Sequence, residues 1–201
     1  MLLLLFAFLV AVPAHAAEKL VLVFGDSLAA GYQLKPGEGF VPQLQAALST
    51  GGRTLRVHNA AVSGDTSAAG RARLGWVLKS LKQKPDVAIV ALGANDMLRG
   101  LSPAGTRANL DAILAELRRQ NIPVVLAGML AAPNMGAEYS RQFNAIYPAL
   151  AKKHGATLYP FFTRGVTGNA HYLLADGMHP NAAGVQHMVR GITPAVQKAL
   201  G

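Results

Sequence analysis

The sequence predicts a single α/β domain in which helices cover both faces of a parallel β-sheet. Short apolar runs, typical of strands buried on both faces, alternate with longer amphipathic stretches. The links between these segments are short, and such alternation is typical of a parallel sheet packed between two layers of helices. No linker, internal repeat or low-complexity segment interrupts the alternation beyond residue 16, so we expect residues 17–201 to form one domain.

Five segments are expected to be strands. Residues 20–24 (L-V-L-V-F) form a continuous apolar run, as expected for a strand with no solvent-exposed face. The other expected strands, the last of them with a weaker pattern, are 55–60, 87–92, 123–127 and 157–159.

Helices are expected between these strands and after the last one. The clearest signals belong to 103–120, because Ser102 can cap this helix, Pro103 suits its first position, and its apolar residues form one stripe. The other expected helices are 41–48, 67–81, 138–154 and 181–200.

Residues 1–16 are predicted to be a signal peptide rather than part of the domain. An unbroken apolar run from Leu2 to Val12 precedes Pro13 and the tripeptide Ala-His-Ala, which is the pattern of a signal h-region followed by an A-x-A cleavage site. No Lys or Arg precedes the run, and the run is shorter than the about 20 residues that cross a bilayer. We therefore expect export to the periplasm or beyond, with a mature chain that begins near Ala17.

Composition and charge restrict the classes of partner. The chain has no cysteine, which excludes thiol nucleophiles and thiolate metal ligands. Its net charge of +9 is spread over scattered Lys and Arg residues, Arg73 among them, without aromatic interleaving or a nucleic-acid motif. We expect a solvated basic surface that permits transient contact with a membrane surface, no nucleic-acid partner and no obligate protein partner.

Metal and nucleotide sites have no support in the sequence either. The histidines are dispersed, with no H-x-x-H or H-E-x-x-H pairing. The glycines of 25–31 match neither the phosphate-binding loop nor the dinucleotide-binding fingerprint. No metal and no cofactor are therefore expected.

Polar, glycine-containing turns follow several of the expected strands, at the edge where the active crevice of an open parallel sheet lies. The turn after the first strand is G-D-S-L (25–28), the next strand is followed by A-A-V-S-G-D-T (60–66), and the third by G-A-N-D (93–96). The loop D-G-M-H-P (176–180) precedes the final helix. We expect these turns to meet at one edge of the sheet.

Together, the turns contain the groups that acyl transfer to a serine requires. The Ser27 hydroxyl needs a base to take its proton, and His179 is the candidate. Asp176, three residues before it, can hold the other imidazole nitrogen and so fix the tautomer. The backbone N–H groups of Ser27 and Gly64 and the side-chain amide of Asn95 are available as oxyanion donors.

Neighbouring residues are given structural roles. We expect Asp26 to order the nucleophile turn by hydrogen bonding and Asp96 to cap the helix that follows Asn95. We expect four other histidines to lie at the surface: His58, His154, His171 and His187. For five apolar residues the sequence does not distinguish a place in the core from a place in the wall of an acyl pocket: Met129, Leu130, Met135, Phe161 and Phe162.

The ordered motifs around Ser27, Gly64, Asn95 and His179 resemble those of the GDSL, or SGNH, hydrolases. This resemblance implies a three-layer, flavodoxin-like α/β/α sandwich with the strand order 2-1-3-4-5. It also implies hydrolysis of carboxylic esters and thioesters through an acyl-serine intermediate, without metal or cofactor.

A closer resemblance, to family members of the arylesterase, thioesterase and lysophospholipase type, covers nearly the whole mature chain. It is carried by the stretches 24–32, 59–67, 95–103, 143–152 and 159–162. The chain departs from the common pattern at Ala94, where glycine is frequent, and in the loop 129–136, which leaves acyl-chain length open. Two alternatives remain open as well: a carbohydrate acetyl-esterase and a catalytically silent lipid-binding protein.

Overall fold

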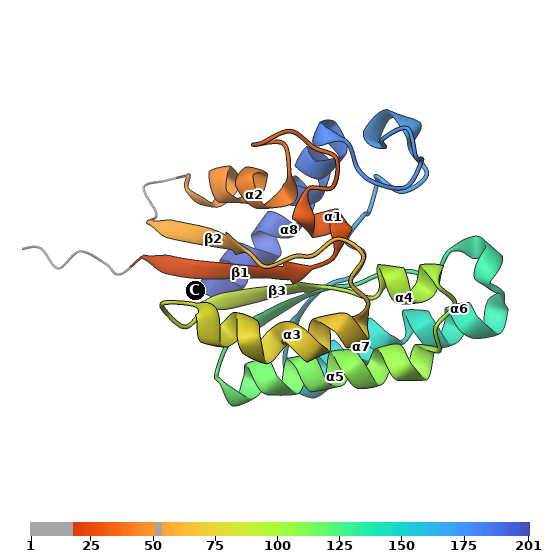
Figure 1. Ribbon diagram of the computed structural model, residues 1–201, viewed down its shortest axis with the longest axis horizontal. Coiled ribbons are helices and arrows are strands. Elements are labelled where there is room, and N and C mark those ends of the chain that lie inside the picture. Colours follow the sequence, from red (N-terminus) through yellow and green to blue (C-terminus); the bar gives the residue numbers. More distant parts are fainter. Residues whose placement is uncertain (1–17, 51–53) are drawn as a thin grey trace, which may run out of the picture.

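The computed structural model describes residues 18–50 and 54–201, and in it a five-stranded parallel sheet lies between two layers of helices (Figure 1). The strands are Lys19–Gly25 (β1), Leu55–Asn59 (β2), Val87–Ala91 (β3), Val124–Ala127 (β4) and Thr157–Tyr159 (β5). Their order is β2-β1-β3-β4-β5, which confirms the predicted flavodoxin-like sandwich. The predicted signal peptide lies outside the described residues.

Helices on the two faces of the sheet come from different parts of the chain (Figure 1). One face is covered by α1 (Ser27–Ala30), α2 (Phe40–Leu48) and α8 (Ala182–Leu200), and the other by α3 (Ser67–Ser80), α5 (Pro103–Arg119) and α7 (Ile146–His154). The shorter elements are α4 (Ala94–Leu98), α6 (Ala137–Asn144) and the 3₁₀ turns η1 (Pro133–Met135) and η2 (Ala170–Tyr172).

Burial along the strands explains why their sequence patterns differ in strength. Residues 20–24 of β1 and all of β3 are completely buried, because these strands are central and helices cover both of their faces. Strand β5 lies at the edge of the sheet and its residues are only half-buried. The weak apolar pattern of 157–159 follows from this edge position.

Helix α5 forms as predicted, with the Ser102 hydroxyl accepting a hydrogen bond from the Gly105 amide at 3.2 Å and Pro103 in the first position. The single helix predicted over 138–154 is wrong, because the segment forms α6 and α7 with a break at Ala145. Pro148 is the cause: it has no amide hydrogen to donate, and its ring opposes the carbonyl four residues earlier, so it is tolerated only in a first helical turn.

The expected surface position of His154 is also wrong. This side chain, in the last turn of α7, is only 6% exposed, and its Nε2 lies 2.6 Å from Oδ1 of Asp111 on α5. The contact joins two helices of the same layer. Its two residues are far apart in the sequence, so no local sequence pattern predicts it.

Candidate active site

The predicted site residues meet at the edge of the sheet where the strands end. Ser27 is the first residue of α1, two residues after the end of β1, and Asn95 lies in α4, four residues after the end of β3. Gly64 lies on the loop between β2 and α3, and His179 on the loop between β5 and α8. Because β1 and β3 are adjacent while the chain between them visits β2, the site lies at the switch point of the sheet.

The turn that carries Ser27 is held by Asp26, as predicted. The buried Asp26 carboxylate accepts a hydrogen bond from the Leu28 amide at 3.1 Å and so caps α1, while the Asp26 amide donates to the Ala91 carbonyl of β3 at 3.2 Å. Burial raises the pKa of Asp26 to about 7, and the nearby carboxylates of Asp65 and Asp96 add to the rise.

The loop that carries the imidazole is held by bonds within itself. The amides of Met178 and His179 both donate to Oδ1 of Asp176 at 2.9 Å, and the Leu174 amide donates to the His179 carbonyl at 2.8 Å. The backbone hydrogen bonds from His179 and Met178 and the contact with the His179 ring lower the pKa of Asp176 to about 2. Asp176 is therefore a carboxylate that only accepts hydrogen bonds.

A continuous chain of polar contacts joins the three predicted triad residues. His179 Nδ1 lies 2.7 Å from Oδ2 of Asp176, and His179 Nε2 lies 2.9 Å from the Ser27 hydroxyl oxygen. Because Asp176 only accepts, Nδ1 of a neutral imidazole carries the hydrogen and Nε2 is free to accept from the hydroxyl. The Tyr32 ring packs against the imidazole, with ring centroids 4.4 Å apart.

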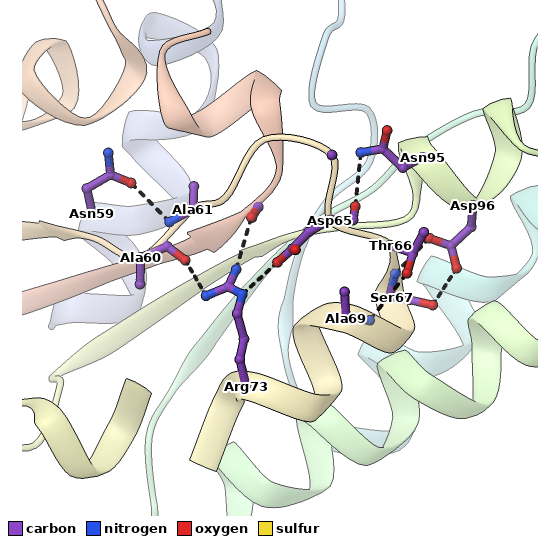
Figure 2. A network of polar contacts seen from close by, with 12 residues as sticks. Asn59, Ala60, Ala61, Asp65, Thr66, Ser67, Ala69, Arg73, Asn95 and Asp96 are labelled. Atoms are coloured by element: carbon purple, nitrogen blue, oxygen red, sulfur yellow. Dashed lines mark hydrogen bonds and ion pairs between the residues drawn. The ribbon is translucent and has the colours of Figure 1, made fainter. Parts of the chain in front are cut away.

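The predicted oxyanion donors are held by their neighbours. Gly64 has φ +86°, in the left-handed region that favours glycine, and its carbonyl accepts from Nη2 of Arg99 at 2.8 Å. The Asn95 amide donates from Nδ2 to the Asp65 carbonyl at 2.9 Å (Figure 2), and Asn95 lines the cleft beside Ser27. One N–H of this amide thus remains for a group bound in the cleft.

Asp96 does not cap the helix after Asn95, so that prediction is wrong. Helix α4 begins at Ala94, which places Asp96 inside the helix with its side chain buried. Its carboxylate accepts from the Ser67 amide at 2.7 Å, at the start of α3, and from the Thr106 hydroxyl of α5 at 3.1 Å. It therefore ties the Asn95 helix to two longer helices.

Arg73 was expected among the solvated surface charges, and the structure contradicts this. Its side chain is only 20% exposed and points from α3 toward the strand ends, where Nε donates to Asp65 Oδ2 at 2.6 Å (Figure 2). Asp65 precedes the helix, so the pair does not follow the helical spacing that sequence patterns detect.

A cleft of about 480 Å³ opens beside Ser27, Asn95 and His179. Its walls are mostly apolar, and they include Leu28, Met97, Leu98, Met129, Leu130 and Phe161. Of the five residues left open in the sequence, Met129, Leu130 and Phe161 thus line the cleft. Phe162 is fully buried in the core against Phe40, and Met135 packs against the core outside the cleft lining.

A serine hydroxyl that contacts an imidazole, which in turn contacts a carboxylate, is the arrangement of a serine hydrolase. Here it lies on an α/β/α fold, beside an apolar cleft. Residues 23–187 match the GDSL-like lipase/acylhydrolase family, and the chain belongs to this family. It is therefore an enzyme that hydrolyses ester bonds.

Several similar proteins are named as esterases or thioesterases, and the similarity extends over most of their lengths. Esterase TesA of Pseudomonas aeruginosa is 38% identical over 192 residues, which cover 96% of this chain and 94% of that enzyme. Thioesterase 1/protease 1/lysophospholipase L1 of Escherichia coli K12 is 38% identical, with 88% of this chain and 82% of that protein covered. The crystal structure of AlinE4, an SGNH-hydrolase family esterase, superposes with a TM-score of 0.78 at 49% identity, covering 94% of this chain and all of that one.

Proposed function

We propose that Ser27, His179 and Asp176 form the catalytic triad of an esterase that cleaves carboxylic esters and thioesters of small molecules. His179 Nε2 takes the Ser27 proton as the hydroxyl oxygen attacks the acyl carbon, and the imidazolium then gives that proton to the leaving alcohol or thiol. Water, deprotonated by the same imidazole, releases the acid from the acyl-serine. The observation that carries this proposal is the contact chain of 2.9 and 2.7 Å from hydroxyl to carboxylate.

The tetrahedral oxyanion is proposed to be bound by the backbone N–H groups of Ser27 and Gly64 and by the Asn95 amide. The left-handed backbone of Gly64 and the fixed amide of Asn95 support this assignment. Donors held in place before the reaction stabilise the developing charge without reorganising, which is usually the largest single contribution to such catalysis.

The substrate is proposed to carry a medium to long acyl chain in the apolar cleft. A cleft of about 480 Å³ with Leu, Met and Phe in its walls is much larger than an acetyl group needs, which disfavours the carbohydrate acetyl-esterase alternative. The names of the Pseudomonas and Escherichia relatives, and of an arylesterase of Vibrio mimicus that is 38% identical, support ester, thioester and lysophospholipid substrates.

The decisive experiment is Ser27→Ala on the purified mature chain, assayed with p-nitrophenyl butyrate and octanoate. We expect a loss of kcat of about 10⁴-fold or more, since triad nucleophiles typically contribute that much. Ser80→Ala, an exposed serine at the end of α3, is the matched control and should keep full activity. Undiminished turnover by the Ser27 variant would contradict the proposal.

Covalent labelling distinguishes the proposed serine esterase from the alternative of a catalytically silent lipid-binding protein. An active serine should react with a fluorophosphonate at one site, and the label should disappear in the Ser27→Ala variant. A chain that binds fatty acid but takes up no label would instead support the silent alternative.

Export is proposed as well, with residues 1–16 removed during secretion. In residues 18–50 and 54–201 no helix is both long and apolar enough to cross a membrane. The expected result is a mature chain that starts near Ala17 in the periplasmic fraction, as determined by intact mass and N-terminal sequencing. An unprocessed chain in that fraction or in the cytoplasm would contradict this.

A further inference from the structure

One guanidinium group contacts several of the segments that make up the candidate active site. From α3, Arg73 donates through Nε to Asp65 Oδ2 at 2.6 Å and through Nη1 to the Ala60 carbonyl at 2.7 Å (Figure 2). Through Nη2 it donates to the Gly25 carbonyl at 3.2 Å. The guanidinium carbon also lies 4.2 Å from the centroid of the Phe24 ring. The rigid planar fork of arginine allows this, since its donors can engage several acceptors at once.

Each acceptor belongs to a segment that carries a proposed oxyanion donor. Gly25 ends β1, two residues before Ser27. Asp65 directly follows Gly64, and Ala60 begins the same loop at the end of β2. Arg73, which lies outside the cleft lining, thus links the segment that carries Ser27 to the segment that carries Gly64. The Val62 amide, which donates to the Gly25 carbonyl at 3.0 Å, links the same two segments through the backbone.

The third donor is reached through the backbone of Asp65. The Asp65 carbonyl accepts from Asn95 Nδ2 at 2.9 Å, which turns the nitrogen end of this amide, rather than its oxygen, toward the Gly64 loop. If the Asp65 segment moved, the amide would lose the acceptor that sets its rotation and could present its oxygen to the oxyanion instead. An acceptor oxygen there would repel the charge that a donor should stabilise.

We propose that Arg73 is a positioning residue of the oxyanion hole, acting through Asp65 on Gly64 and Asn95. The proposal rests on the proposed esterase function. Arg73 touches no substrate in this arrangement and contributes by fixing donors before the oxyanion forms. Its loss should therefore lower kcat and leave ground-state binding nearly unchanged.

The first test compares Arg73→Lys and Arg73→Gln with Arg71→Gln. Arg71 is the matched control, because it extends from the same helix two residues away and its exposed side chain makes a hydrogen bond to Asn109, at 3.3 Å, away from the proposed oxyanion donors. For both Arg73 variants we expect kcat per fluorophosphonate-titrated site to fall about 10- to 100-fold, less than for outright deletion of an oxyanion donor. KM should stay within about threefold, and Arg71→Gln should match wild type.

Two further readouts distinguish positioning from simple stabilisation of the fold. Affinity for an alkyl boronic acid, which forms a charged tetrahedral adduct with the serine, should fall in parallel with kcat. The pH dependence of kcat/KM should keep its shape, because the His179–Asp176 pair lies on another loop. A structural defect alone would lower the number of titratable sites and the Tm and leave kcat per site unchanged, and that result would overturn the proposal.

A double-mutant cycle with Asn95→Ala completes the test. If Arg73 acts through Asn95, the effect of Arg73→Lys should shrink to about threefold or less in the Asn95→Ala background, the remainder acting through Gly64. An undiminished effect in that background would overturn the proposal. Should the Arg73 variants fail to fold, Asp65→Asn removes the other partner of the ion pair and must show the same loss of kcat and the same coupling.

The Ser27→Ala and Asn95→Ala variants separate this proposal from the proposed function. Activity that survives Ser27→Ala would contradict the proposed function itself, and an Asn95→Ala variant with unchanged kcat would contradict the proposed oxyanion hole. With both of those variants impaired as expected, an Arg73→Lys enzyme with wild-type kcat would contradict only the positioning role.

Discussion

The part of the site that carries Ser27, Gly64 and Asn95 is held mostly by hydrogen bonds between separate elements of the fold, whereas the part that carries Asp176 and His179 is held by local ones. The first part depends on contacts between separate elements, from Asp26 to Ala91, from Asp96 to Ser67, and from Arg73 to the ends of β1 and β2. In the second, Asp176 holds the amides of its own loop, and its side chain remains 36% exposed.

In the proposed mechanism, this difference corresponds to two chemical tasks. Oxyanion donors must be fixed before charge develops, which rigid strand ends and buried bonds achieve. A base must exchange its proton with substrate and water, which a partly exposed loop allows. Distant substitutions should therefore impair the first task and leave the second intact, and the following variants test that separation.

The largest expected effect is that of Asp176→Asn. Its amide nitrogen, opposite the imidazole, would force His179 to accept at Nδ1 and carry its hydrogen at Nε2, where it cannot take the Ser27 proton. Changes of this kind in catalytic triads lower kcat by about 10⁴-fold. The measurement is kcat for p-nitrophenyl butyrate, with thermal unfolding monitored to show that the loop is retained.

The pH profile gives this prediction a second check. Because the pKa of Asp176 is held at about 2, its carboxylate stays charged throughout the range in which the enzyme can be assayed. No acid limb of kcat/KM above pH about 3 should therefore belong to Asp176. If Asp176→Asn kept a kcat within tenfold of that of the wild type, the argument that Asp176 fixes the tautomer of His179 would be incorrect.

Asn95→Ala, in the other part of the site, comes next. Removal of one oxyanion donor typically lowers kcat by about 10²- to 10³-fold, and KM should change much less because the oxyanion forms only after attack. The shape of the pH profile should not change. Asn134→Ala, an exposed position in η1, serves as control. An unchanged kcat would remove Asn95 from the oxyanion hole.

Leu130→Trp tests the apolar wall of the cleft. This side chain lines the cleft and is 44% exposed, so a larger ring should shorten the space for an acyl chain. Because burial of one methylene contributes about 0.8 kcal/mol, losing contact with two of them should lower kcat/KM for a long-chain ester about tenfold relative to the butyrate.

Leu101→Trp is the matched control, since Leu101 is 42% exposed and does not line the cleft. It should leave the chain-length preference as in wild type. If both variants changed the preference equally, the acyl chain would bind outside the cleft described above.

The smallest effect on catalysis, and a distinct effect on stability, is expected for Asp26→Asn. The folded protein keeps the Asp26 proton up to pH about 7, whereas the unfolded chain releases it near 3.8, so Asp26 makes the free energy of unfolding fall as pH rises between these values. At about 1.4 kcal/mol per pKa unit, this loss amounts to roughly 4 kcal/mol at most.

Asparagine does not titrate and still offers an oxygen to the Leu28 amide, so the variant should lose less stability than wild type between pH 4 and 8. Urea unfolding at both pH values measures the difference, and comparing changes with pH removes any constant cost of the substitution. Identical pH dependence in the two proteins would show that Asp26 ionises normally in the folded state.

Much of this site could be predicted from sequence, because its chemical groups follow strands at fixed short distances. Ser27 and Asn95 lie within four residues of the ends of β1 and β3, and the unbroken apolar runs of these strands identify them as buried. The short helix α1 was not among the expected helices, since a single turn carries no measurable periodicity. A helix was expected after Asn95, but α4 begins at Ala94, so Asp96 lies inside that helix rather than at its N-cap.

By itself, the sequence predicted the α/β class, the strand order that the family resemblance implies, and the candidate site residues Ser27, Asp176, His179, Gly64 and Asn95. These depend on local patterns, on motifs of fixed spacing and on turn chemistry. Only the tertiary structure decided that Arg73 points inward and which apolar residues line the cleft. The physical reason is that such contacts join residues brought together by packing, and their partners have no fixed separation along the chain.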